Sequence, residues 1–380
     1  MRLHGCCECR ACTFQVALPA ETVTRIDCHC PACRKHAAAA FVAWLPAPRR
    51  ALTWGTSGDC EWRQRPSACV PARVRATCAG HGRPVDKHVC PQCDSVMALE
   101  PVGGEDVEVA IGPRLPVPQE RRSVRACPVL PCSDVCVRAK LCVLVQGPPT
   151  KARARAGCID DGDYTDLRAG RRDDDSKWPP GLRLETTARC TATRAPWNLP
   201  AHRHQGERLP SGCESPTTAR AVSGSCMCGA LSFELSAGMP REIQHCYCTQ
   251  CRKTAGAPFV TWAPVRARDF KWTAGEHTML KQLRSSWEAV REGCRACGST
   301  LRMVYAGVEH AWQQPGPAGA GGGCVWPAVG ALDFVQDGAE GGHPPVPAPA
   351  HRVVHICVSS KAPWVVLPDD GAPRLEYAFD

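Results

Sequence analysis

Short segments in which apolar and polar residues alternate occur toward both ends of the chain and predict β-strands. Residues 231–235 alternate in this way, as expected of a strand with one buried face. Residues 259–262 and 301–305 are further short strand candidates, and residues 13–16 and 107–111 behave alike nearer the N-terminus. Helical periodicity is weak throughout, so the sequence predicts a mainly β protein.

These strand candidates belong to two copies of one unit. Residues 28–54 align without gaps with residues 246–272 at an offset of 218, and residues 5–14 align with residues 224–233 at an offset of 219. The aligned positions that carry identical residues include Arg34/Arg252, Lys35/Lys253, Phe41/Phe259, Val42/Val260, Trp44/Trp262, Pro46/Pro264 and Trp54/Trp272. Two copies fall short of a repeat array. We therefore expect two domains, at residues 4–112 and 223–380.

Two stretches lack any period and are expected to be disordered. Residues 113–212 would form a long irregular linker, and the Gly/Pro/Ala-rich residues 315–350 would interrupt the second domain. The linker contains 18 Lys/Arg and 11 Asp/Glu, so it supplies most of the formal net charge of +9. Because this charge belongs to a solvated linker and not to a folded face, nucleic acid is an unlikely partner.

The spacing of the cysteines indicates that the protein binds metal. Of the 28 cysteines, 14 form two ordered sets of Cys-x-Cys, Cys-x-Cys-x-x-Cys and Cys-x-x-Cys. The first set is Cys7, Cys9, Cys28, Cys30, Cys33, Cys90 and Cys93, and the second is Cys226, Cys228, Cys246, Cys248, Cys251, Cys294 and Cys297. Such pairs suit tetrahedral zinc, because one short turn can aim two sulfurs at one ion. The other 14 cysteines receive no role.

Each set of seven sulfurs divides into a group of four and a group of three. Cys226, Cys228, Cys294 and Cys297 offer a closed structural zinc site, in which Gly229 and Gly298 permit the left-handed backbone of two zinc-binding turns. In the first copy, Arg10 and Asp94 replace these glycines. A non-glycine residue in a left-handed turn costs roughly 1 kcal/mol, and Asp tolerates that conformation better than Arg.

The remaining sulfurs, those of Cys246, Cys248 and Cys251, would hold a second zinc with one position open. A zinc with three thiolates carries a formal charge of −1 and suits binding a further thiol as thiolate. Arg252 and Lys253 would then attract the carboxylates of a substrate. The alternative is a purely structural zinc, closed by His245 or another residue.

Three runs, from Gly224 to Ala230, from His245 to Lys253 and from Cys294 to Ser299, resemble the glutathione-dependent formaldehyde-activating enzymes, a family that includes centromere protein V. The last segment, with Cys357-Val-Ser-Ser-Lys-Ala-Pro-Trp364, is similar to the C-terminal end of that family. The resemblance implies tandem zinc-binding β-tent domains. It also implies carbon–sulfur lyase chemistry on adducts of a small thiol and an aldehyde, such as S-hydroxymethylglutathione.

Carried over by motif, Cys246, Cys248 and Cys251 would be catalytic, and the four-cysteine group of the second copy would be structural. The first copy keeps seven sulfurs, but it has a longer interval between Cys33 and Cys90 and no Trp-containing end after Gly112. We expect it to bind zinc as a degenerate, supporting copy.

Two other functions are compatible with the sequence. One is a non-catalytic, zinc-stabilised interaction module related to centromere protein V, and the other is a thiol-rich redox or metal-buffering protein. No apolar run approaches the roughly 20 residues that span a bilayer, and the N-terminus lacks the apolar core of a secretory signal. We therefore expect a cytoplasmic protein without membrane contact, with the nucleus as the alternative compartment.

Overall fold

A computed structural model describes residues 2–9, 11–18, 22–56, 71–78, 83–110, 183–190, 221–238, 240, 242–285, 289–305, 323–333 and 352–376. Both copies belong to one compact unit, Met1–Val117 with Arg172–Asp380. A second unit, Pro118–Arg171, lies outside the described residues. The described part is mainly β, as the sequence predicts.

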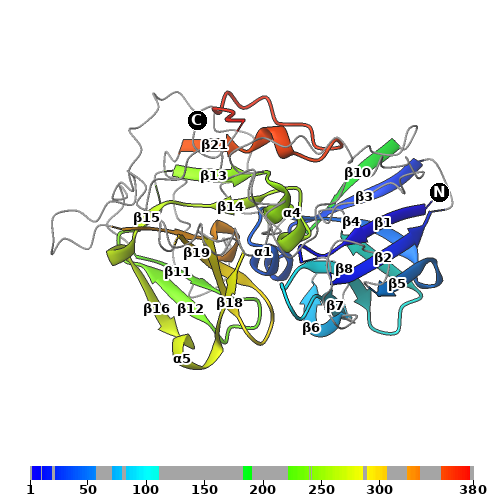
Figure 1. Ribbon diagram of the computed structural model, residues 1–380, viewed down its shortest axis with the longest axis horizontal. Coiled ribbons are helices and arrows are strands. Elements are labelled where there is room, and N and C mark those ends of the chain that lie inside the picture. The colour runs from blue at the N-terminus through cyan, green and yellow to red at the C-terminus, as the bar shows by residue number, and fades with distance from the viewer. Residues whose placement is uncertain are drawn as a thin grey trace, which may run out of the picture. The chain divides into compact units, whose positions relative to one another are not determined.

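The first copy contains two sheets (Figure 1). The smaller has the order β1-β2-β5, and the larger has the order β10-β3-β4-β9-β8-β7-β6. Their strands are β1 (Arg2–Cys6), β2 (Cys12–Ala17), β3 (Thr22–Cys28), β4 (Val42–Pro48), β5 (Leu52–Thr56), β6 (Ala72–Cys78), β7 (Arg83–Val89), β8 (Val96–Pro101), β9 (Asp106–Ala110) and β10 (Arg183–Arg189). The helix α1 (Pro31–Ala37) follows β3, and the short turn η1 (Arg49–Ala51) joins β4 to β5.

The second copy repeats this plan in three sheets, with the orders β11-β12-β16, β14-β13-β21 and β15-β20-β19-β18-β17. The strands are β11 (Val222–Ser225), β12 (Ser232–Leu235), β13 (Glu242–Cys246), β14 (Val260–Trp262), β15 (Val265–Arg266), β16 (Phe270–Ala274), β17 (Leu280–Arg284), β18 (Ala289–Cys294), β19 (Thr300–Tyr305), β20 (Cys324–Pro327) and β21 (Arg352–Ile356). The helical elements are α4 (Thr249–Ala255), α5 (Glu276–Met279), η7 (Ala267–Asp269), η8 (Val329–Ala331) and η9 (Val358–Ser360). The continuous β4 of the first copy corresponds to β14 plus β15, which is why one sheet there becomes two here.

One strand lies where the sequence predicted a disordered linker. Strand β10, within residues 113–212, pairs in parallel with β3 in the register Arg183↔Thr22 to Arg189↔Cys28. Strand β21 pairs with β13 in the same parallel way (Figure 1). The first copy therefore has a counterpart of the closing strand, so the expectation that its end is missing after Gly112 was wrong. Residues 323–333, inside the segment 315–350 that the sequence predicted to be a disordered insertion, form β20 and η8 and bury Val325, Trp326 and Val329, so that expectation was wrong for this part. The rest of residues 113–212, apart from 183–190, and the rest of residues 315–350 lie outside the described residues.

Each sulfur-bearing loop between a β-strand and a helix is set by its cysteines. Cys30 and Cys248 are the N-caps of α1 and α4, and their sulfurs accept hydrogen bonds from the backbone N–H groups of Cys33 and Cys251, both at 3.4 Å. A side-chain acceptor at this position satisfies a backbone donor that the first helical turn leaves free. Cys30 and Cys248 therefore each cap a helix and also belong to the cysteine motif.

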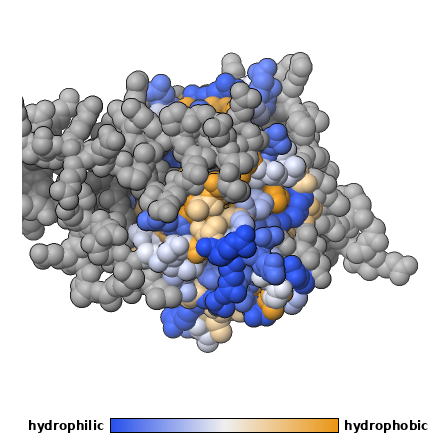
Figure 2. All heavy atoms as spheres, turned by 90° about the vertical axis from the view of Figure 1, so that its right-hand side faces the viewer, coloured by the Kyte–Doolittle hydropathy of each residue, from blue (hydrophilic) through white to orange (hydrophobic). Residues whose placement is uncertain are grey.

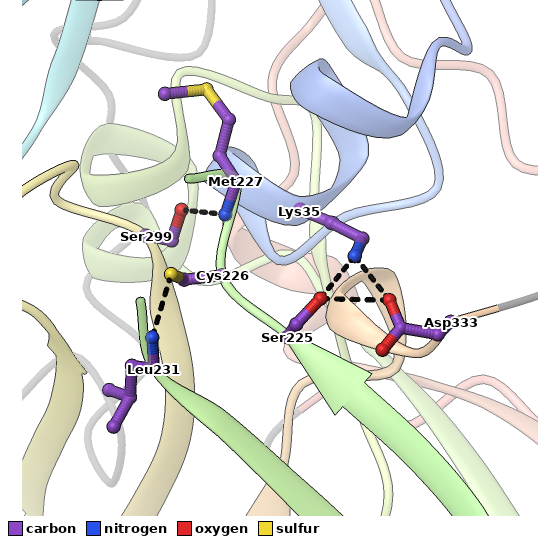
Figure 3. Close-up of polar contacts among 7 residues, drawn as sticks. All are labelled: Lys35, Ser225, Cys226, Met227, Leu231, Ser299 and Asp333. Carbon is purple, nitrogen blue, oxygen red and sulfur yellow. Dashed lines mark hydrogen bonds and ion pairs between the residues drawn. The ribbon is translucent and has the colours of Figure 1, made fainter. Parts of the chain in front are cut away.

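The two copies meet through equivalent residues. Lys35 of α1 contacts Ser225 and Asp333, while its counterpart Lys253 of α4 donates to the sulfur of Cys6 at 3.7 Å. Ser225 also donates to Asp333 at 2.9 Å, as Figure 3 shows. The equivalent rings of Phe41 and Phe259 meet edge to face at 5.7 Å. This is the self-complementary pattern of an isologous dimer interface, here formed within one chain.

Figure 2 shows one face of the first copy, on which a small hydrophobic area lies above a larger area of hydrophilic side chains. Within the described residues, no helix has the length and apolar character needed to cross a membrane.

Glycine permits a close cross-strand contact in each copy. Gly224 of β11 lies opposite Phe233 of β12, and a methyl group added at Gly224 would lie 2.3 Å from the Phe233 ring. Gly5 and Phe14 repeat the arrangement, at 2.2 Å. Phe233 is fully buried and stacks on Phe270 at 5.1 Å, so the ring has no room to move aside.

We therefore expect Gly224→Ala to destabilise the protein by about 1–3 kcal/mol, the range typical of an overpacked core. Gly323→Ala is the matched control, because a methyl group there meets nothing within 4 Å. Urea unfolding followed by tryptophan fluorescence compares the two variants. Equal midpoints for Gly224→Ala and Gly323→Ala would contradict the packing argument.

Candidate functional site

The predicted four-cysteine group of the second copy comes together. The sulfurs of Cys226, Cys228, Cys294 and Cys297 all lie within 4.8 Å of one another, with Cys226–Cys228 at 3.5 Å and Cys228–Cys294 at 3.7 Å. They come from the turn between β11 and β12 and the turn between β18 and β19. Zinc–sulfur bonds of 2.3 Å in a tetrahedron place two sulfurs about 3.8 Å apart, so these residues fit zinc.

Backbone and hydroxyl groups hold the two turns. The Leu231 N–H donates to the Cys226 sulfur at 3.3 Å, and the Met227 N–H donates to the Ser299 hydroxyl at 3.1 Å (Figure 3). Gly229 and Gly298 adopt φ values of 77° and 72°, the left-handed conformation that the sequence predicted.

The first copy builds the same kind of group from Cys7, Cys9, Cys90 and Cys93, with Cys7–Cys9 at 3.5 Å and Cys9–Cys90 at 3.7 Å. Asp94 takes the left-handed position at φ 56°, and its carboxylate is paired with Lys281 of the second copy at 2.8 Å. Aspartate tolerates this conformation better than most residues, which fits the retention of the turn without glycine. Arg10 lies outside the described residues.

The three-cysteine group of the second copy is also assembled. Cys246 ends β13, Cys248 caps α4 and Cys251 lies in its first turn. The three sulfurs lie within 4.8 Å of one another, and each residue is at most 5% exposed. His245 is not grouped with them, and its ring instead shares a hydrogen bond with the Thr261 hydroxyl at 3.1 Å.

A buried cation lies against these sulfurs. Arg291 of β18 donates from its guanidinium to the Cys251 sulfur at 3.4 Å, and it lies 5.7 Å from the centre of the Trp262 ring. Burial opposes the charge of Arg291, but the sulfurs of Cys251 and Cys248 outweigh burial and raise its pKa. The guanidinium is therefore a fixed positive charge beside an anionic group, a feature that the sequence reasoning missed.

Two further side chains border this group. Burial, followed by the nearby sulfurs of Cys246, Cys251 and Cys248, holds the pKa of Tyr305 well above its usual value, so its hydroxyl stays protonated. Cys357, which follows β21 in a left-handed conformation at φ 57°, places its sulfur 4.0 Å from that of Cys246. Cys357 is nevertheless not among the sulfurs that lie within 4.8 Å of one another.

A hydrogen-bond chain fixes the residue between the first two cysteines. The Tyr247 hydroxyl bonds His355 at 2.9 Å, and His355 bonds Asp370 at 3.0 Å. Burial lowers the pKa of His355 despite the opposing effect of Asp370. Tyr247 is 1% exposed and His355 is also 1% exposed, so the chain links the loop before α4 to β21 inside the protein.

Arg252 and Lys253 do not have the role that the sequence suggested. Each is only 4% exposed. Arg252 donates to the Tyr247 carbonyl at 3.1 Å, and Lys253 contacts Cys6 of the first copy. Both cations are used in holding α4 and the contact between copies, so they cannot attract the carboxylates of a substrate from solvent.

The corresponding group in the first copy contains two cysteines that the sequence reasoning left without a role. The sulfurs of Cys28, Cys30, Cys78 and Cys190 lie within 4.8 Å of one another. Cys33, the third residue of the motif, interacts with Cys28, Cys30 and Cys78. Cys190 had a signal in the sequence, because Cys190-Thr-Ala-Thr-Arg-Ala-Pro-Trp197 matches Cys357-Val-Ser-Ser-Lys-Ala-Pro-Trp364. Cys78 had none.

Comparisons with known proteins agree with this architecture. The family model described as "Glutathione-dependent formaldehyde-activating enzyme" matches residues 2–113 and 221–312, together more than half of the chain. A protein of Halomonas elongata, named "Putative glutathione-dependent formaldehyde-activating enzyme", is 29% identical over 150 residues, which are 38% of this chain and 79% of the relative. The chain therefore belongs to the glutathione-dependent formaldehyde-activating enzyme family, with two copies of the family's domain in tandem.

Proposed function

We propose that the second copy is a zinc-dependent carbon–sulfur lyase that acts on adducts of a small thiol, such as glutathione, with an aldehyde, such as formaldehyde. Cys246, Cys248 and Cys251 would hold the zinc, and Cys226, Cys228, Cys294 and Cys297 would hold a structural zinc. The observation that carries the proposal is a buried group of three mutually close sulfurs beside groups of four in the same chain. Three sulfurs leave a tetrahedral ion one position for a ligand.

Zinc bound there would lower the pKa of a thiol that reaches it and so supply a thiolate at neutral pH. In adduct formation, the thiolate sulfur attacks the aldehyde carbon, a C–S bond forms, and the carbonyl oxygen takes up a proton. In cleavage, the hydroxyl proton leaves, the C=O bond forms again, and the electron pair of the C–S bond returns to sulfur. No oxidant or reductant is needed in either direction.

The side chains around the sulfurs suit this chemistry. Arg291 offsets the negative charge of three thiolates inside the protein, where water cannot. Tyr305 keeps its proton and can donate a hydrogen bond to an oxygen that gains negative charge. The Tyr247–His355–Asp370 chain holds the loop from Cys246 to Cys248 in place.

The first prediction concerns Cys251. With Cys251→Ala, the rate of a thiol–aldehyde condensation assay should fall to the uncatalysed background, because the two sulfurs that remain, those of Cys246 and Cys248, do not hold the ion. Cys33→Ala is the matched control, since Cys33 occupies the same motif position in the first copy and should leave the rate within about twofold. Zinc content is measured on both variants. If both retain the rate of the unaltered protein above background, the lyase proposal fails and the interaction-module reading gains support.

The second prediction concerns Arg291. Arg291→Gln removes the charge that faces Cys251, and partners of metal ligands typically contribute 10–100-fold to metal affinity or activity. We expect kcat/KM to fall by about that factor and one zinc per chain to exchange faster with a chelator. Arg291→Lys, which keeps the charge, should recover most of both. A loss of kcat/KM that is equal in Arg291→Gln and Arg291→Lys, with no change in zinc exchange, would contradict an electrostatic role.

A further inference from the structure

In the first copy, the place that corresponds to the open site is surrounded by extra sulfurs. The Cys78 sulfur lies 3.8 Å from that of Cys28 and 3.6 Å from that of Cys30. Two thiolates that share one tetrahedral zinc lie about 3.8 Å apart. The spacing also matches the 3.5–3.7 Å found in the two groups of four sulfurs at the other sites. Cys78 therefore stands in the position of a zinc ligand.

Cys78 has no equivalent in the second copy. Strand β6 pairs with β7 as far as Cys78↔Arg83, which brings the end of this hairpin to the sulfurs of the motif. The corresponding strand β17 ends at Arg284, and residues 280–293 contain no cysteine. The longer hairpin of the first copy accounts for part of the longer interval between Cys33 and Cys90.

Burial and charge favour a metal here. Cys28, Cys30, Cys33 and Cys78 are each at most 1% exposed. Lys87 is also 1% exposed, and it donates to the Ala32 carbonyl of α1 at 3.0 Å. Lys87 and Arg291 both lie three residues before the next motif cysteine. Lys87 interacts electrostatically with Cys33, as Arg291 does with Cys251, so each copy places a buried cation near its sulfurs. Buried thiolates paired with a metal and a cation avoid the cost of uncompensated charge.

We propose that Cys28, Cys30, Cys33 and Cys78, whose side chains all interact with one another, form a closed four-thiolate zinc site in the first copy. Cys190, whose sulfur lies within 4.8 Å of those of Cys28, Cys30 and Cys78, lies at its edge. The site links β3, α1 and the β6–β7 hairpin, and it leaves no position for a substrate thiol. The chain then binds four zinc ions, three in closed sites and one in an open site. This inference does not depend on the proposed lyase activity, because it concerns metal retention alone.

Zinc content and release test the proposal on the full-length chain. The purified protein should contain four zinc ions, of which one transfers rapidly to a chromogenic chelator and three transfer slowly. Cys78→Ser should add a second rapidly released ion, while the control Cys190→Ser should leave three slow ions. Retention of three slowly released ions in Cys78→Ser would overturn the proposal. A fall from three slowly released ions to two in Cys190→Ser would also overturn it.

Alkylation of the unaltered protein gives a second test that does not require a variant to fold. Treatment with N-ethylmaleimide followed by peptide mass spectrometry should leave Cys78 unmodified in the zinc-loaded chain and modified after chelation, in step with Cys28 and Cys30. Modification of Cys78 in the zinc-loaded chain while Cys28 stays protected would overturn its assignment as a ligand. Neither readout involves turnover, so a negative lyase assay would not affect the result.

Discussion

The fold depends on bringing sulfurs from distant parts of the chain to within about 4 Å of one another. Cys228 and Cys294 are 66 residues apart in sequence, yet their sulfurs are 3.7 Å apart. Strand pairing alone does not require this approach, because the two turns that carry the sulfurs lie at the ends of different sheets. Left-handed residues at 229 and 298, and backbone N–H groups aimed at sulfur, orient each turn toward a shared point. A metal ion at that point would supply part of the folding free energy.

Because the domain is duplicated, the second copy packs against the folded first copy. The turn η8 approaches the residues that follow α1 so closely that a methyl group at Gly330 would lie 2.5 Å from the backbone of Ala39. Trp364 of the second copy packs against the buried core of the first, and the Arg25 guanidinium lies 5.1 Å from the centre of its ring. Lys35 binds Ser225, the residue before the cysteine turn that begins at Cys226. These contacts give the first copy a structural role that is independent of any chemistry of its own.

Local patterns in the sequence were enough to predict a mainly β protein with several of its strands, the duplication and the four-cysteine groups at the Cys-x-Cys and Cys-x-x-Cys turns. Alternation at residues 231–235 corresponds to β12, with Phe233 and Leu235 buried, and the motif spacing placed the sulfurs of the four-cysteine groups together. Contacts that depend on tertiary packing could not be predicted from the sequence. Arg291 precedes Cys294 in a strand with no periodic sign of its role. Arg252 and Lys253 look like surface cations in the sequence, but the fold buries both, Arg252 against the Tyr247 carbonyl and Lys253 against Cys6 of the first copy. Cys78 is isolated in sequence, so only the length of a hairpin reveals its partners.

The proposed roles of the two copies would separate support from reactivity on one scaffold. Strand pairing, helix capping by cysteine and the buried cation are common to both, with Lys87 in one and Arg291 in the other. The difference lies in what reaches the position beyond the three motif sulfurs. A hairpin that extends to Cys78 supplies a fourth thiolate at 3.6–3.8 Å in the first copy, whereas in the second the nearest additional sulfur, that of Cys357, contacts Cys246 at 4.0 Å without joining the close group. Closing a site favours retention of its metal, and leaving one position free allows a ligand to bind, so neither copy can serve both purposes equally well.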